Sequence, residues 1–265
     1  MTQLRLSYAY GTSSQPLLGM TIGDKFDQAC LQYADHDAVV SVHQNVRLSY
    51  QQLQEKVNAF ACKLLDLGLK KGDRIGIWSP NCVEWTITQF AAFKAGIILV
   101  NLNPAYKSSE LEYVLNKVGC KALVIAASFK TTDYQEIICK LAPELAQTRN
   151  KVLNAEKLPH LNIVIKIDDT EHTGIHRFSD LMPEPTAEQL AELEAIGKDL
   201  QFDETINIQF TSGTTGNPKG TMLTHNNILN NGYFVGEAIH LSPQDRVCIS
   251  VPLFHCFGMV MGNLA

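Results

Sequence analysis

The chain of 265 residues has the composition of an ordinary globular protein, with 45% hydrophobic and 18% charged residues. Its formal net charge of -5 and its scattered lysines and arginines argue against a nucleic-acid partner, which would need a concentrated basic surface. Seven widely spaced cysteines without a C-x-x-C pair favour a reducing compartment over a disulfide scaffold or a zinc site. Neither a signal or transit peptide nor an apolar transmembrane run is evident, so we expect a cytoplasmic protein.

The first two thirds of the chain alternate predicted strands and helices. A hairpin is expected at 37–50, and the helix after it should begin at a capping box of Ser49 with Gln52 and end near Gly68. Further strands are predicted at 74–78, 97–102, 122–126 and 162–167, and further helices at 83–94, 110–117, 133–141 and 186–196. Because the strands are apolar on both faces and alternate with helices, we predict an α/β fold with a largely parallel sheet.

The most specific motif is the run TSGTTGNPKG at residues 211–220, directly after a strand predicted at 206–210. Glycines let backbone N–H groups approach phosphate oxygens, hydroxyls add donors, and a lysine adds positive charge. The run differs from a Walker A loop, because Pro218 precedes the lysine and Gly220 follows it. It predicts a phosphate-binding loop, against the alternative of a surface segment that is merely rich in small polar residues. A helix at 225–236 and a strand at 246–251 are expected to follow.

This segment resembles the signature loop of the adenylate-forming (AMP-binding) superfamily, which includes acyl-CoA synthetases, peptide-synthetase adenylation domains and beetle luciferases. Other stretches resemble successive family motifs in the same order: LSYQQL at 48–53, GDRI at 72–75, FKAG at 93–96, NPAY at 103–106, THNN at 224–227 and PLFH at 252–255. The resemblance covers residues 20–265. It implies layered α/β subdomains, with residues 1–265 forming an incomplete N-terminal adenylation domain that lacks the mobile C-terminal domain.

The resemblance also implies a two-step reaction, in which a carboxylate attacks the α-phosphate of ATP and a thiol then captures the acyl-adenylate. Lys219 would be catalytic by neutralising the leaving pyrophosphate, and His255 by lying beside the acyl carboxylate. Magnesium would bridge the phosphates through ligands beyond the chain end, and no metal site is predicted within the chain. The phosphate-binding residues implied by the family motif are Thr211, Ser212, Gly213, Thr214, Thr215, Gly216 and Lys219.

The expected partners are ATP, CoA as co-substrate and a small carboxylate. The PLFH and NLNPAY stretches look more like medium- or long-chain acyl-CoA synthetases than amino-acid-activating domains, so we expect a fatty acid. Two alternatives stay open: an adenylation domain that loads a carrier protein, and a noncatalytic truncated product. Because the family's adenine- and ribose-binding segments, acidic magnesium residue, hinge and C-terminal catalytic lysine lie beyond this chain, we expect the isolated chain to have negligible ligase activity.

Several other conspicuous residues are expected to be structural. His172 and His176 have helical i, i+4 spacing, but no third ligand accompanies them, so a metal site is not predicted there. His225 is expected to pack at the start of its helix. Trp78 and Trp85 are expected in the core.

Overall fold

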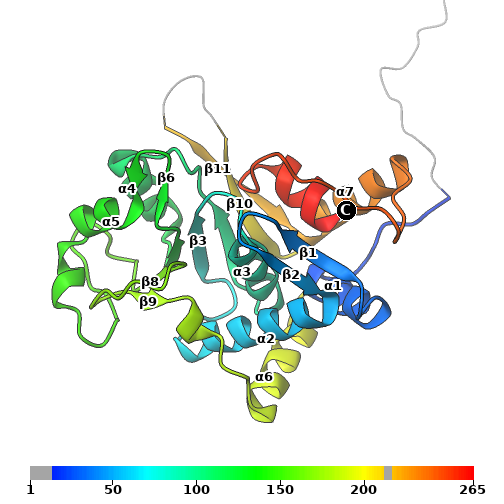
Figure 1. Ribbon diagram of the computed structural model, residues 1–265, viewed down its shortest axis with the longest axis horizontal. Coiled ribbons are helices and arrows are strands. Elements are labelled where there is room, and N and C mark those ends of the chain that lie inside the picture. The colour runs from blue at the N-terminus through cyan, green and yellow to red at the C-terminus, as the bar shows by residue number, and fades with distance from the viewer. Residues whose placement is uncertain (1–13, 212–216) are drawn as a thin grey trace, which may run out of the picture.

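The computed structural model describes residues 14–211 and 217–265, and its centre is a seven-stranded sheet of order β11-β10-β4-β3-β5-β8-β9 (Figure 1). The strands of this sheet are β3 (Arg74–Trp78), β4 (Ile98–Asn101), β5 (Ala122–Ile125), β8 (Ile163–Lys166), β9 (His176–Arg177), β10 (Thr205–Thr211) and β11 (Lys219–Thr224). From β10 to β9 all neighbouring strands are parallel, and β11 pairs antiparallel with β10 at the edge. The prediction of a largely parallel α/β sheet is therefore confirmed.

Helices cover both faces of the sheet (Figure 1). One hydrophobic core joins the sheet to α1, α2, α3, α6 and α7, and a second core on the opposite face joins it to α4 and α5. The helices are α1 (Ile22–Gln32), α2 (Tyr50–Asp66), α3 (Val83–Lys94), α4 (Ser108–Val118), α5 (Tyr134–Leu141), α6 (Ala187–Asp199) and α7 (His225–Ala238). Three short helical segments, η1 (Pro143–Gln147), η2 (Ser179–Leu181) and the π-helix η3 (Phe257–Leu264), and two small hairpins, β1–β2 (Asp37–Ser41, Val46–Ser49) and β6–β7 (Ser128–Phe129, Thr132–Asp133), complete the described part.

Local sequence signals set the ends of α2. The Ser49 hydroxyl accepts a hydrogen bond from the Gln52 amide at 3.2 Å, and the Gln52 side chain accepts one from the Ser49 amide at 2.9 Å. This capping box satisfies two backbone donors that the first turn leaves free. Gly68 takes a φ of +90° just beyond the helix, where a side chain would be strained.

The predicted core tryptophans are both fully buried. Trp78 stacks on Tyr134, with ring centroids 3.7 Å apart, and its indole N–H donates to the carbonyl of Asn103 at 3.1 Å. This contact ties β3 to α5 and satisfies the indole's only polar group.

Two parts of the sequence behave differently from expectation. Residues 219–224 form the edge strand β11, which was not predicted, because its mostly exposed KGTMLT sequence lacks an apolar face. The strand predicted at 246–251 is wrong: within the described residues, this segment pairs with no strand. Its last residue bonds instead to a side chain, with Asn81 Nδ2 donating to the Val251 carbonyl at 2.8 Å.

His225 packs at the start of α7, as predicted. Its side chain is 1% exposed, and Nδ1 accepts a hydrogen bond from the Ile22 amide at 3.1 Å, which joins the starts of α1 and α7. Burial lowers the pKa of His225 from 6.5 to about 4, an effect that Glu204 and Asp24 oppose. The folded protein therefore keeps this imidazole neutral at pH values where the unfolded chain protonates it.

We expect His225 to make the free energy of unfolding fall as pH drops from 6.5 to about 4. The unfolded state binds the proton first in this window, and the loss from this one residue should approach about 3 kcal/mol. Chemical denaturation at pH 7 and pH 4.5 should show a shallower pH slope for His225→Gln than for wild type. His160→Gln, at an exposed position, is the control and should keep the wild-type slope. A wild-type slope in the His225 variant would contradict the assignment.

Candidate functional site

The predicted phosphate motif begins where β10 reaches the carboxyl edge of the sheet. Thr211 is the last residue of β10 and pairs in register with Lys219, the first residue of β11. The Thr211 hydroxyl donates to the Lys219 carbonyl at 3.5 Å, and both residues are exposed. A hydroxyl and an ammonium group are thus carried on adjacent strand ends at the edge where parallel α/β sheets bind ligands. Ser212, Gly213, Thr214, Thr215 and Gly216 lie outside the described residues.

His255 lies in a tight turn just before η3. Its amide donates to the Pro252 carbonyl at 3.2 Å, and its own carbonyl accepts from the Met259 amide at 3.0 Å. The imidazole is exposed and rests against the ring of Phe254, with the centroids 3.9 Å apart. The turn, not a strand end, presents this side chain, because the strand expected before it does not form.

Contacts from the residues after His255 place this turn beside β10. The Cys256 thiol donates to Gln209 Oε1 at 3.0 Å, and Gln209 lies two residues before Thr211. Burial raises the pKa of the Cys256 thiol, which keeps the donor protonated at neutral pH. The structure therefore brings the His255 turn to the strand that leads directly into the phosphate motif.

The AMP-binding enzyme family matches residues 26–265 of the chain. The chain belongs to this AMP-binding enzyme family. It is 43% identical over 264 residues to the mitochondrial medium-chain acyl-CoA ligase ACSF2 of Mus musculus, covering 98% of this chain and 43% of the relative. It is 41% identical over 249 residues to the acyl-CoA synthetase YngI of Bacillus subtilis, covering 94% of this chain and 45% of the relative. The chain thus spans less than half the length of these relatives.

Solved structures show the same fold at low sequence identity. The long-chain-fatty-acid-CoA ligase FadD1 of Archaeoglobus fulgidus matches with a TM-score of 0.75 and 22% identity, covering 98% of this chain and 47% of that one. A fatty acyl CoA synthetase of Mycobacterium tuberculosis matches with a TM-score of 0.72 and 22% identity, covering 92% and 42%. The chain therefore has the N-terminal domain fold of adenylate-forming enzymes, as predicted.

Buried amide side chains near the site were missed at the sequence level. Asn101, Asn207 and Gln209 lie on β4 and β10 and are 2%, 0% and 8% exposed. Asn207 Nδ2 donates to Asn101 Oδ1 and to the Leu99 carbonyl, each at 2.9 Å. Polar residues inside otherwise apolar strands are the signal that marks such positions, because a buried amide needs partners.

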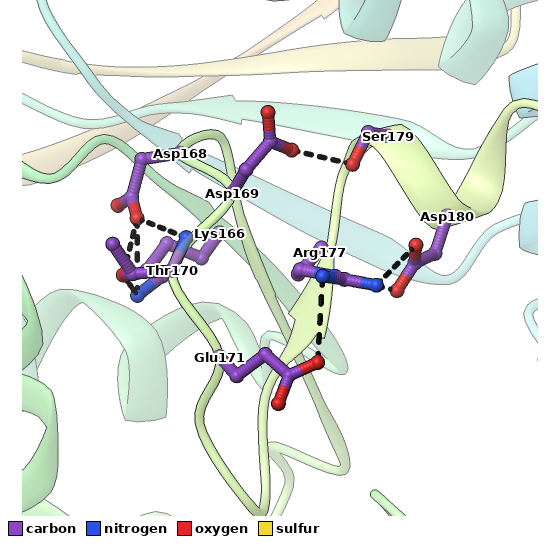
Figure 2. A network of polar contacts seen from close by, with 8 residues as sticks. All are labelled: Lys166, Asp168, Asp169, Thr170, Glu171, Arg177, Ser179 and Asp180. Carbon is purple, nitrogen blue, oxygen red and sulfur yellow. Dashed lines mark hydrogen bonds and ion pairs between the residues drawn. The ribbon is translucent and has the colours of Figure 1, made fainter.

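A second polar network surrounds the end of β8 (Figure 2). Lys166 Nζ donates to Thr170 and, at 2.6 Å, to Gln135, and it forms an ion pair with Asp168 at 3.2 Å. On neighbouring β9, Arg177 makes two hydrogen bonds to Asp180, at 2.8 and 2.9 Å (Figure 2). Because these charges are paired with one another, the network holds the loop between β8 and β9 and has a structural role.

Within the described residues, no group of three or more His, Cys, Asp and Glu side chains is placed to hold a metal ion. His172 Nε2 instead lies 3.5 Å from the Cys139 thiol. No helix of the described part is long and apolar enough to cross a membrane.

Proposed function

We propose that the chain is the N-terminal portion of an ATP-dependent, AMP-forming acyl-CoA ligase that activates a fatty carboxylate as its acyl-adenylate and then transfers it to CoA. The observation that carries the proposal is the 43% identity to a medium-chain acyl-CoA ligase across 98% of this chain. Residues 1–265 would then be an incomplete adenylation domain, which a mobile C-terminal domain completes.

In this proposal, the motif that begins at Thr211 binds the phosphates of MgATP. The exposed Thr211 hydroxyl and Lys219 ammonium fit this role, because they offer a donor and a positive charge on paired strand ends. Ser212, Gly213, Thr214, Thr215 and Gly216 are assigned with them from the family motif. Magnesium would arrive with ATP and take its protein ligands from beyond residue 265.

His255 is proposed to lie beside the acyl carboxylate. The hydrogen bond between Cys256 and Gln209 supports this role, because it keeps the turn close to the end of β10. An imidazole N–H can donate to a carboxylate oxygen and orient it toward the α-phosphate. CoA is the proposed acceptor because both relatives described above are named as CoA ligases or synthetases.

The compartment is proposed to be reducing, with the cytoplasm as the expected site. All seven cysteines are free thiols in the structure. The mouse relative is named as mitochondrial. Fractionation of the source cell should therefore test for the protein in the mitochondrial fraction as well as in the cytoplasm, if the cell has mitochondria. A secreted, disulfide-bonded form would contradict the proposal.

The experiment that tests the function begins with the intact mass of the native polypeptide, compared with 29.4 kDa for this chain. That polypeptide should release AMP from ATP in the presence of a medium- or long-chain fatty acid and CoA. The 265-residue chain, assayed alone by pyrophosphate exchange, should be almost inactive. AMP release that needs a carrier protein instead of CoA would favour the carrier-loading alternative. Failure to form AMP with any fatty acid would overturn the ligase proposal.

A further inference from the structure

The backbone just before His255 is bonded by the side chain of Asn81, which lies in the loop between β3 and α3. Asn81 Nδ2 donates to the Val251 carbonyl, and Asn81 Oδ1 accepts from the Leu253 amide, both at 2.8 Å. A neighbouring strand would offer the same donor and acceptor to this stretch. The amide side chain of Asn81 therefore replaces the strand partner that residues 251–253 lack.

A second amide reaches the same stretch from the end of β4. Asn101 Nδ2 lies 3.4 Å from the Leu253 carbonyl, 3.3 Å from the Phe254 carbonyl and 3.3 Å from Met259 Sδ. The orientation of this amide is fixed by Asn207, whose Nδ2 donates to Asn101 Oδ1 at 2.9 Å. Since the oxygen of Asn101 accepts that bond, its nitrogen must face the two carbonyls and the thioether.

The two amides together hold Leu253 on both sides. Asn81 Oδ1 accepts from the Leu253 amide, and Asn101 Nδ2 faces the Leu253 carbonyl. The Leu253 side chain lies in the core and is 5% exposed. The residue after His255 is also held, through the bond from Cys256 to Gln209 at 3.0 Å. His255 is thus an exposed side chain on a turn whose backbone is fixed before and after it. Without these bonds, a turn at the surface would open more easily.

We propose that Asn81 and Asn101 are positioning residues for His255. From the loop after β3 and the end of β4, they fix the turn that presents the imidazole at the carboxyl edge of the sheet, next to the start of the phosphate motif. The proposal rests on the proposed function in one respect, namely that His255 faces the acyl carboxylate. In that case, loosening the turn weakens the use of the carboxylate and leaves the binding of MgATP unchanged, since Thr211 and Lys219 are carried on other strands.

The first measurement is hydrogen exchange by mass spectrometry on the 265-residue chain, which needs no activity. Asn81→Ala should speed exchange in peptides covering 251–259 by about tenfold. The variant loses the hydrogen bonds to the Val251 carbonyl and from the Leu253 amide, and this loss lowers the free energy needed to open the turn locally. Asn81→Asp keeps the acceptor for the Leu253 amide but places a carboxylate oxygen against the Val251 carbonyl, so it should also speed exchange at 251–259. The matched control is Asn116→Ala, which removes one amide bond to the Lys157 carbonyl, at 2.9 Å, on the opposite face of the sheet.

The second measurement is steady-state kinetics of the same variants in the ligase-active native polypeptide. Asn81→Ala and Asn101→Leu should raise the KM for the carboxylate by about tenfold, and Asn81→Ala, whose lost hydrogen bonds join Val251 and Leu253 rather than β10, should keep the KM for MgATP within about twofold of wild type. A general loss of stability would not produce this split. Asn101 is fully buried, so the Asn101→Leu variant is the one more prone to misfolding. Asn81 is only partly buried, and Asn81→Ala keeps the test decisive if Asn101→Leu fails to fold.

Unchanged exchange at 251–259 in Asn81→Ala would overturn the proposal, and so would faster exchange spread evenly over the chain. Faster local exchange with unchanged carboxylate kinetics would refute the link to His255. If the wild-type polypeptide activates no carboxylate, the proposed function fails, and the exchange measurement still decides whether the two amides fix the turn.

Discussion

Replacing Lys219 with alanine should lower the rate of acyl-adenylate formation by about 100- to 1000-fold, the cost of removing one preorganised charge from a developing anion. Lys219 opens β11 directly opposite Thr211, so its ammonium group stands at one end of the phosphate motif. In the proposed reaction, negative charge would gather on pyrophosphate as the bond between the α- and β-phosphates breaks, and the ammonium group would stabilise it. Because this interaction strengthens in the transition state, kcat should fall more than the KM for MgATP rises.

Pyrophosphate exchange by the native polypeptide at saturating carboxylate measures this effect. Lys219→Ala should fold normally, since the side chain is exposed and β11 pairs with β10 through its backbone. Lys219→Arg keeps the charge and should retain part of the rate, although its planar head differs in geometry. Lys198→Ala is the matched control, because it removes one exposed lysine that pairs with Glu194 on α6. Exchange by Lys219→Ala above a tenth of the wild-type rate would refute the catalytic role.

The central sheet and its main helices were predictable because local signals agree with tertiary packing. Helix α3 has the predicted limits, Val83–Lys94, and Gly96 follows it with a φ of +66°. Strand β3 also has its predicted limits, because RIGIW is apolar enough to be buried on both faces of a parallel sheet. In these elements the burial pattern follows directly from composition and spacing.

The edge of the sheet and the approach to His255 were not predictable in the same way. Strand β11 forms because its backbone pairs with β10. Its one large apolar side chain before Leu223, Met222, is 68% exposed, so no alternation of buried and exposed residues marks the strand in the sequence. Residues 246–251 have strand-like composition, but the bond that fixes their end comes from Asn81, 170 positions away from Val251. A contact between residues so far apart in the sequence cannot be predicted from the pattern of neighbouring residues.

The candidate site also combines residues that the sequence identifies with residues that only the structure identifies. Thr211, Lys219 and His255 were identified through family motifs, and the structure brings the His255 turn to the strand that ends in Thr211. Asn101 and Asn207 appeared in the sequence only as interruptions of apolar strands. Their importance depends on mutual hydrogen bonding across β4 and β10, which only the register of the two strands reveals.

Lys166→Ala should lower the free energy of unfolding by about 3 to 5 kcal/mol, the usual cost of removing one member of a buried ion pair. The Lys166 side chain is 2% exposed, and its ammonium group bonds to Thr170 and Asp168 (Figure 2). It also donates to Gln135 on α5. Alanine would leave the Asp168 carboxylate without its cation and open a cavity where the methylene stem packed. Denaturant unfolding at pH 7 measures the loss.

Two variants separate the contributions. Lys166→Met keeps most of the stem volume and removes the charge, so it should be less destabilised than Lys166→Ala. Lys140→Ala breaks an exposed pair with Glu136 and should change stability by less than about 1 kcal/mol. A loss below about 1 kcal/mol in Lys166→Ala would show that the network adds little to the loop between β8 and β9.

The pH dependence identifies the charge as the source. Burial opposes ionisation of Asp168, but hydrogen bonds from Thr170 and Lys166 outweigh it and hold the pKa of this carboxyl below its ordinary value of 3.8. A depressed carboxyl pKa stabilises the fold above the unfolded value, and this contribution is lost as pH falls through the folded value. The difference between wild type and Lys166→Met should therefore be constant from pH 7 to pH 5 and should shrink below about pH 3.8. The His225 slope cancels in this comparison, because both proteins contain that residue.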